Sequence, residues 1–127
     1  MADRDAPALS LASARGIATA KLADYRDGAE WRRILAASGA DLLALAGYLR
    51  LVPADVVAAY HGRIINVHPA LLPRFGGAGM HGRRVHEAVL AAGERESGAT
   101  VHVVDEVYDR GMILAQGRVA VPRGATP

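Results

Sequence analysis

Apolar residues recur along this chain in two patterns, short runs and spacings of three to four positions. Short runs are typical of strands, and the wider spacing is typical of helices that bury one face. We predict strands over residues 17–21, 41–47, 63–68, 100–104 and 112–121, the last bent at Gly117, and helices over 6–15, 29–38, 53–60 and 83–92. Strands that alternate with helices indicate βαβ units, so we expect an α/β fold with a mostly parallel sheet.

Residues at the ends of these segments support the predicted helices. Asp5 is the expected N-cap of the first helix, and Gly16 follows its last turn. Trp31, Ile34 and Leu35 fall on one stripe of the second helix. Residues 41–47 form a nearly continuous apolar run, which predicts a strand covered on both faces.

The segment 63–68 carries two polar residues inside a strand pattern. Ile64, Ile65 and Val67 are β-branched, whereas Asn66 and His68 interrupt the run two positions apart. Side chains alternate between the faces of a strand, so Asn66 and His68 point to the same face. The proline at position 69 ends the strand, which places the pair at a carboxyl edge, where open α/β sheets bind ligands.

Length and composition limit the class of protein. With 127 residues, the chain is expected to form a single domain over 1–127. No apolar run is long enough for a membrane helix, and no signal peptide is apparent, so we predict a cytoplasmic protein that does not contact membranes. Cysteine is absent and the net charge is only +2 with scattered arginines, which argues against disulfides, thiolate chemistry and nucleic-acid binding.

Other catalytic patterns are missing from the sequence. None of the five histidines forms the i, i+4 pair with a nearby Glu that is typical of hydrolytic zinc sites, so we expect no metal. The serines lie in no Gly-x-Ser-x-Gly elbow. The glycines of residues 76–79 lack the Gly-Lys-Ser/Thr sequence of a phosphate-binding loop.

Two motifs resemble those of a known family. Residues 66–73, Asn-Val-His-Pro-Ala-Leu-Leu-Pro, are similar to the signature of the folate-dependent formyltransferases. Residues 100–111, which read Thr-Val-His-Val-Val-Asp-Glu-Val-Tyr-Asp-Arg-Gly, resemble the family segment that ends in a functional aspartate. The resemblance extends over nearly the whole chain, and it is greatest to the group that formylates glycinamide ribonucleotide in de novo purine biosynthesis.

The resemblance implies a Rossmann-like doubly wound fold and a set of catalytic roles. Asn66 is expected to stabilise the oxyanion of a tetrahedral intermediate, His68 to act as acid and base, and Asp109 to position His68 and relay protons through water. His102 resembles a nearby family histidine and is expected on the substrate side. This chemistry needs a hydrogen-bond donor, an acid/base and a carboxylate, without a metal.

The resemblance also implies a binding site for 10-formyltetrahydrofolate as the co-substrate. The segment 45–52 is similar to the family segment that holds the pterin ring, so Arg50, Leu51 and Val52 are candidate contacts. The opposite wall is expected from Val104, Asp105 and Glu106. Residues 74–79 correspond to the loop beside substrate and folate, and the family often has a cis peptide at the position of Leu72-Pro73.

One part of the family pattern has no counterpart here. Family members begin with a strand, a Gly- and Ser-rich loop that holds the ribonucleotide phosphate, and a helix. We therefore expect a partial formyltransferase domain that lacks this N-terminal unit and a further C-terminal segment. Three interpretations stay open: a glycinamide ribonucleotide formyltransferase, a formyltetrahydrofolate hydrolase or formyltransferase acting on another amine, and an inactive fragment that binds folate or pairs with another chain, including a homo-oligomer.

Overall fold

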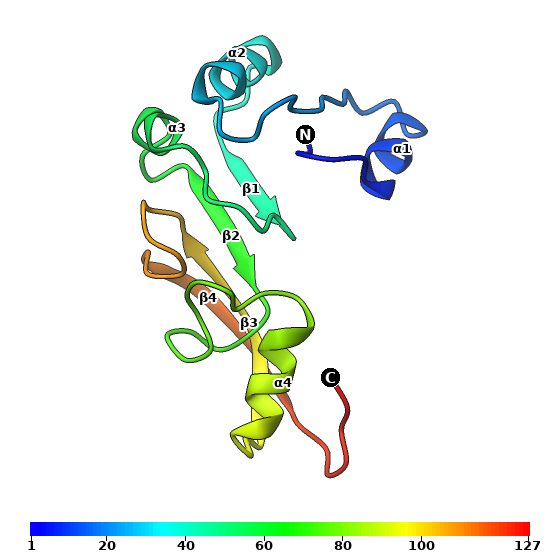
Figure 1. The fold of residues 1–127 in the computed structure, drawn as a ribbon, viewed down its shortest axis with the longest axis vertical. Coiled ribbons are helices and arrows are strands. Elements are labelled where there is room, and N and C mark those ends of the chain that lie inside the picture. Colours follow the sequence, from blue (N-terminus) through cyan, green and yellow to red (C-terminus); the bar gives the residue numbers. More distant parts are fainter.

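A computed structural model describes residues 1–127 and contains four helices and four strands. In chain order they are α1 (Pro7–Ser13), α2 (Gly28–Ser38), β1 (Leu43–Ala46), α3 (Ala54–Ala59), β2 (Ile64–His68), α4 (Arg83–Ala91), β3 (Glu96–Val103) and β4 (Ile113–Ala120) (Figure 1). The predicted α/β class is confirmed. No helix is long and apolar enough to cross a membrane.

The four strands form one sheet in the order β1-β2-β3-β4. Only β1 and β2 are parallel, while the β2–β3 and β3–β4 pairs are antiparallel. The expectation of a mostly parallel sheet is therefore wrong for these residues. Figure 1 shows the reason: α4 continues away from the start of β2 instead of returning to it, so β3 runs back along β2.

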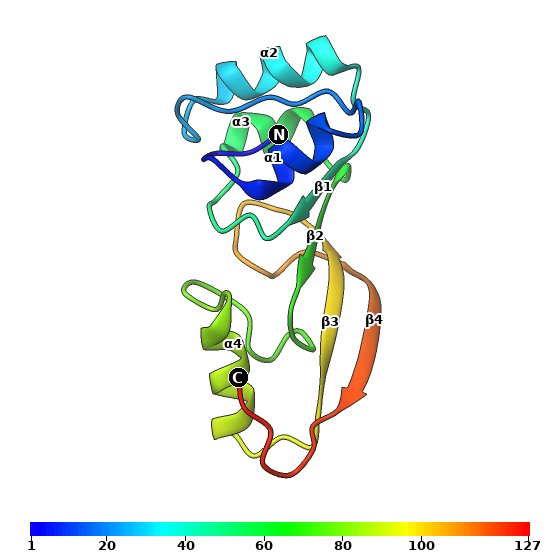
Figure 2. The same cartoon turned by 90° about the vertical axis from the view of Figure 1, so that its right-hand side faces the viewer.

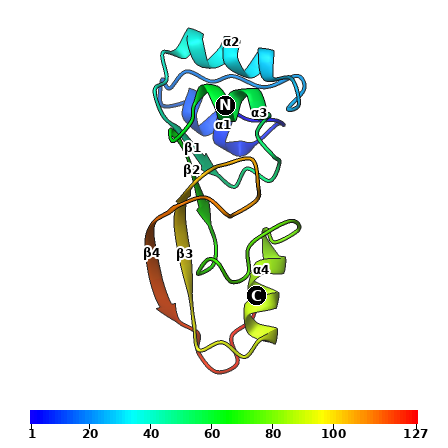
Figure 3. The same ribbon diagram turned by 90° about the vertical axis from the view of Figure 1, so that its left-hand side faces the viewer.

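The core consists of two clusters on the same sheet. The larger one joins α2 and α3 to β1 and β2, and its buried residues are Leu22, Trp31, Leu35, Leu43, Val52, Val56, Val57 and Ile64. The smaller one consists of Ala70, Val85 and Val89, under the loop that follows β2 and under α4. Figures 2 and 3 show from opposite sides that α4 and this loop lie over one face of the sheet.

The N-terminal segment differs from the prediction in two ways. Residues 17–21 form no strand, because their only pairing is an isolated bridge between Lys21 and Ala2. Asp5 does not cap α1. The N-cap residue is Ala6, without a side-chain bond, and the Asp5 carboxylate instead pairs with Lys21 at 2.7 Å.

The remaining strands also differ in detail. β1 is not covered on both faces, since Leu43 is buried but Ala44 and Ala46 are exposed. β3 begins four residues before the predicted start. The irregularity predicted at Gly117 lies elsewhere, because His102 pairs with Ile113 and Val101 with Ala115, which leaves Leu114 as the extra residue.

Candidate active site

The polar residues of β2 and β3 meet side by side on one face of the sheet. The strand register pairs Asn66 with His102, and His68 with Thr100. The two histidines are buried, with exposed fractions of 3% for His68 and 2% for His102. The predicted common face of Asn66 and His68 therefore includes a second histidine, which comes from the neighbouring strand.

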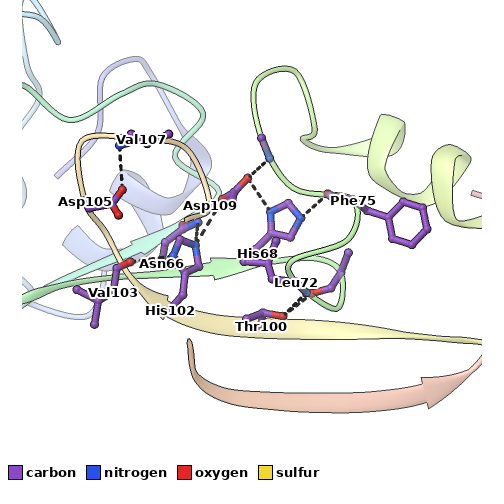
Figure 4. A network of polar contacts seen from close by, with 12 residues as sticks. Asn66, His68, Leu72, Phe75, Thr100, His102, Val103, Asp105, Val107 and Asp109 are labelled. Carbon is purple, nitrogen blue, oxygen red and sulfur yellow. Dashed lines mark hydrogen bonds and ion pairs between the residues drawn. The ribbon is translucent and has the colours of Figure 1, made fainter. Parts of the chain in front are cut away.

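Asp109 completes this group from the loop between β3 and β4. Its Oδ2 atom lies 3.5 Å from Nδ1 of His68, and its Oδ1 atom lies 3.4 Å from Nε2 of His102 (Figure 4). The backbone N–H of Gly77 donates a hydrogen bond of 2.9 Å to Oδ2. Asp109 has a φ of 56°, a left-handed conformation that Asp tolerates better than most residues and that is common at functional sites.

The two neighbours of His68 indicate which ring nitrogen carries the proton in the neutral ring. Nε2 lies 2.8 Å from the carbonyl oxygen of Phe75, which can only accept, so Nε2 donates. Nδ1 is then the nitrogen that can take up a second proton, and it faces the Asp109 carboxylate.

The same reasoning applies to His102 and orients Asn66. Nδ1 of His102 donates to the carbonyl oxygen of Val103 at 2.9 Å, so Nε2 is an acceptor in the neutral ring. Nδ2 of Asn66 lies 3.2 Å from this Nε2 and donates to it. One N–H of the Asn66 amide is used in this way, and the second is available for another acceptor.

A cavity of about 430 Å³ opens beside these four residues. Asn66, His68, His102 and Asp109 all line it, as do Arg50, Leu51, Val52, Val104 and Asp105, five of the six predicted folate contacts. Glu106 is exposed and lies outside the lining. A volume of several hundred cubic ångströms with a mostly apolar wall is typical of small-molecule sites.

Other lining residues were not singled out as candidates from the sequence. Among them are Tyr48, Leu49, Met80, His81, His86, Val107 and Tyr108. The backbone groups of Phe75 and Gly77 also escaped prediction as partners of His68 and Asp109. The cluster of glycines at 76–79 was the available signal, since a backbone that approaches other groups this closely favours residues without a side chain.

Tyr48 is a further titratable group in the cavity wall. Its ring packs edge-on against Trp31, with centroids 5.6 Å apart, and its hydroxyl is buried without a hydrogen-bond partner. Burial, with a smaller contribution from the negative charge of Asp3, raises the pKa of Tyr48 to about 12. The phenol is therefore neutral at physiological pH.

No group of three or more His, Cys, Asp or Glu side chains is arranged to hold a metal ion. The peptide bond between Leu72 and Pro73 is cis, as expected from the resemblance.

Comparisons with known proteins add the family context. The chloroplastic phosphoribosylglycinamide formyltransferase of Arabidopsis thaliana is 53% identical over 94 residues, which cover 74% of this chain and 32% of that protein. The crystal structure of glycinamide ribonucleotide transformylase 1 from Symbiobacterium toebii superposes with a TM-score of 0.85 at 35% identity and covers 97% of this chain and 58% of that one. A formyltetrahydrofolate deformylase from Pseudomonas syringae superposes with a TM-score of 0.79 at 28% identity, over 92% of this chain and 39% of that one.

The chain thus spans about a third of the length of the plant relative and somewhat more than half of the Symbiobacterium structure. The sequence pattern of the formyl transferase family matches residues 3–127, nearly the whole chain. The chain belongs to the formyl transferase family.

Proposed function

We propose that this chain carries the formyl-transfer site of a phosphoribosylglycinamide formyltransferase. The proposed reaction moves the formyl group of 10-formyltetrahydrofolate to the amine of glycinamide ribonucleotide in de novo purine biosynthesis. The observation that carries the proposal is the convergence of Asn66, His68 and Asp109 at one wall of the cavity. The names of the most similar relatives support the choice of substrate.

The bond changes define what the site must do. The amine nitrogen attacks the formyl carbon, and the carbonyl oxygen becomes negative in a tetrahedral intermediate. The bond from this carbon to N10 of the folate then breaks, and N10 takes up the proton that the amine loses. A preorganised donor for the oxyanion and a group that moves the proton are therefore the two catalytic requirements.

Asn66 suits the first requirement and His68 with Asp109 suits the second. The amide of Asn66 keeps one N–H for an acceptor in the cavity, while its bond to His102 fixes its orientation. Nδ1 of His68 is the nitrogen that can receive a proton, and the Asp109 carboxylate stabilises the cation and can pass the proton on through water. In this scheme the buried ring of His102 orients Asn66 from the cavity wall. A contact between His102 and the substrate stays a prediction.

The folate is proposed to occupy the cavity between residues 50–52 and residues 104–106. Leu51 and Val52 come from the chain after β1, and Val104 follows β3, so the two apolar walls belong to different parts of the sheet. A flat heteroaromatic ring fits such a slot, with backbone groups available for its polar edge. Arg50 and Asp105 are the proposed polar contacts from the cavity wall, whereas the predicted contact of Glu106 would have to come from outside the lining.

A transfer assay tests the proposal. The 127-residue chain is incubated with glycinamide ribonucleotide and 10-formyltetrahydrofolate that carries ¹³C in the formyl group, and the ¹³C signal is followed by NMR. The expected result is loss of the folate signal with the appearance of a formamide on the ribonucleotide. Asp109→Asn is the matched control and should slow the transfer about 10²- to 10⁴-fold. Folate binding without any transfer, in the wild-type chain, would favour the interpretation as a non-catalytic fragment.

A deformylase is the second candidate, because a formyltetrahydrofolate deformylase has the same fold over most of this chain. The same ¹³C experiment without an amine distinguishes the two activities. Without an amine, release of labelled formate as fast as the folate signal is lost in the presence of glycinamide ribonucleotide would favour the hydrolase. Formate release much slower than this would favour transfer. A cytoplasmic location, the absence of nucleic-acid partners and a homo-oligomeric state stay predictions.

A further inference from the structure

Two side chains outside the catalytic cluster hold the loop that follows β2. Thr100 of β3 donates to the carbonyl oxygen of Ala70 at 2.6 Å and accepts from the N–H of Leu72 at 3.0 Å. Nε2 of Gln116, on β4, donates to the carbonyl oxygen of Leu72 at 2.9 Å and to Oγ1 of Thr100 at 3.0 Å. Neither side chain lines the candidate active-site cavity.

These four hydrogen bonds use the full capacity of the Thr100 hydroxyl and of the Gln116 NH₂ group. A hydroxyl has one donor and two acceptor positions, and a carboxamide NH₂ has two donors, so nothing on either group is left unpaired. Thr100 and Ala70 are completely buried, and Leu72 is 5% exposed. Polar networks that are buried and fully satisfied define one local arrangement rather than several.

The same loop makes the contacts that orient the proposed catalytic groups. Three residues after Leu72, the carbonyl of Phe75 accepts from His68, and two residues later the N–H of Gly77 donates to Asp109 (Figure 4). Gly76, between them, packs so closely that an added Cβ would lie 2.5 Å from Cδ2 of Leu72 and 3.0 Å from Cβ of Asp109. A shift of Leu72 is therefore expected to displace the backbone at Gly76, and with it the neighbouring groups of Phe75 and Gly77 that bond to His68 and Asp109.

We propose that Thr100 and Gln116 are positioning residues, which fix the 70–77 loop so that Phe75 and Gly77 aim His68 and Asp109 at each other. The effect that we expect on formyl transfer rests on the proposed function, whereas the effect that we expect on the position of the His68 ring does not. Both residues act through the loop backbone and touch no substrate in this scheme.

NMR of the histidine rings tests the geometric part directly. In the wild-type chain labelled with ¹⁵N, the Nε2 proton of His68 should be visible and slow to exchange, because it is buried and bonded to Phe75. Thr100→Val keeps the side-chain shape but removes the hydroxyl, and the Nε2 proton signal should broaden or disappear. Thr100→Ser keeps the hydroxyl, so the Nε2 proton signal should stay as in the wild-type chain. Gln116→Met, on the edge strand, is the milder second variant and should shift the same signal.

Leu35→Ala is the control for simple loss of stability, since Leu35 belongs to the other core cluster. It should lower the melting temperature and leave the His68 ring signals unchanged. If Thr100→Val and Gln116→Met behave like Leu35→Ala, with lower stability and wild-type ring signals, the two residues are structural only and the inference is wrong.

Kinetics provide the catalytic part of the test. If the wild-type chain transfers formyl groups, Thr100→Val should lower kcat about 10- to 100-fold with little change in KM, since misplaced catalytic groups affect the transition state more than binding. If the wild-type chain shows no transfer, the NMR result still decides the positioning role. Failure of the proposed function and failure of this inference are therefore distinguishable.

Discussion

Oδ2 of Asp109 lies 3.5 Å from Nδ1 of His68, and both side chains are nearly buried, with exposed fractions of 9% and 4%. When His68 carries a second proton, the two groups have opposite charges, which interact more strongly in such surroundings than in water. The two residues are 41 positions apart in the sequence, one at the end of β2 and the other beyond β3. The antiparallel register places the end of β3 beside the start of β2, where Val103 pairs with Ile65. The contact of the two residues therefore depends on the loop after β3, which folds back along the sheet and carries Asp109 to His68.

The first prediction concerns the charge of Asp109. Asp109→Asn keeps the size of the side chain and an oxygen that can accept from Gly77, but it removes the carboxylate beside His68. We expect turnover to fall about 10²- to 10⁴-fold, the usual contribution of acid–base catalysis, with little change in folate affinity. Steady-state kinetics and isothermal titration calorimetry with folate measure the two quantities. Turnover within a factor of three of wild type would remove Asp109 from the proposed mechanism.

The second prediction concerns the oxyanion donor. Asn66→Ala removes the amide that is held by His102, and we expect kcat to fall about 10²- to 10³-fold, as for other single oxyanion donors. Val119→Ala, at a side chain that is 60% exposed on β4, is the control and should leave kcat unchanged. A variant at position 66 that raises KM but keeps kcat would mean that Asn66 binds the ground state instead.

How far the sequence predicted this site depends on the kind of contact. Asn66 and His68 could be placed on one face from the period of a strand alone, because that relationship is local. The pairing of Asn66 with His102 required the strand register, and the backbone contacts of Phe75 and Gly77 required the path of an irregular loop. Local periodicity contains neither kind of information.

For the fold, too, local features could be predicted and long-range features could not. All four strands were found from β-branched and apolar runs, and the parallel pairing of β1 with β2 agrees with the prediction. The antiparallel pairings of β3 were missed, because the direction of β3 depends on where α4 leads the chain. The predicted strand at 17–21 lacks a neighbouring strand, and only the bridge to Ala2 forms. The cap of α1 was assigned from residue type, although the Asp5 carboxylate binds Lys21 instead.

The third prediction uses the two aspartates near the starts of helices. Oδ1 of Asp27 accepts from the backbone N–H of Ala29 at 2.9 Å and of Glu30 at 3.1 Å, so Asp27 is the true N-cap of α2. Asp27→Ala should lower the free energy of unfolding by about 1 kcal/mol. Asp5→Ala removes only an exposed ion pair and should cost clearly less. Urea unfolding compares them, and equal losses would contradict the assignment of the cap.

The fourth prediction concerns space beside the site. At Gly76 an added Cβ meets Leu72 and Asp109, whereas at Gly117 nothing lies within 4 Å and the φ angle is ordinary. Gly76→Ala should therefore destabilise the chain by about 1–3 kcal/mol, the usual cost of overpacking, and should disturb the Nε2 proton signal of His68. Gly117→Ala should be tolerated on both measures. An unperturbed His68 signal in Gly76→Ala would show that the loop can move away without affecting the histidine.

The fifth prediction concerns the neutral phenol of Tyr48. Its hydroxyl is buried without a partner, so Tyr48→Phe should raise the free energy of unfolding at neutral pH by about 1 kcal/mol, the lower end of the cost of an unpaired buried group. The expected pH dependence follows from the pKa, which is about 12 in the folded chain against an ordinary value of 10.0. Between these values the unfolded chain loses the phenol proton and the folded chain keeps it.

In this range the folded chain therefore binds more protons than the unfolded chain. A rise in pH favours the state that binds fewer protons, so the contribution of Tyr48 to the free energy of unfolding decreases as the pH rises from about 10 to about 12. Urea unfolding of wild type and Tyr48→Phe across this range isolates the effect, since the other tyrosines contribute equally to both proteins. The advantage of the phenylalanine variant should grow with pH. A difference that stays constant would mean that the folded and unfolded chains titrate Tyr48 alike, and a loss of stability at neutral pH would mean that the hydroxyl has a partner in solution.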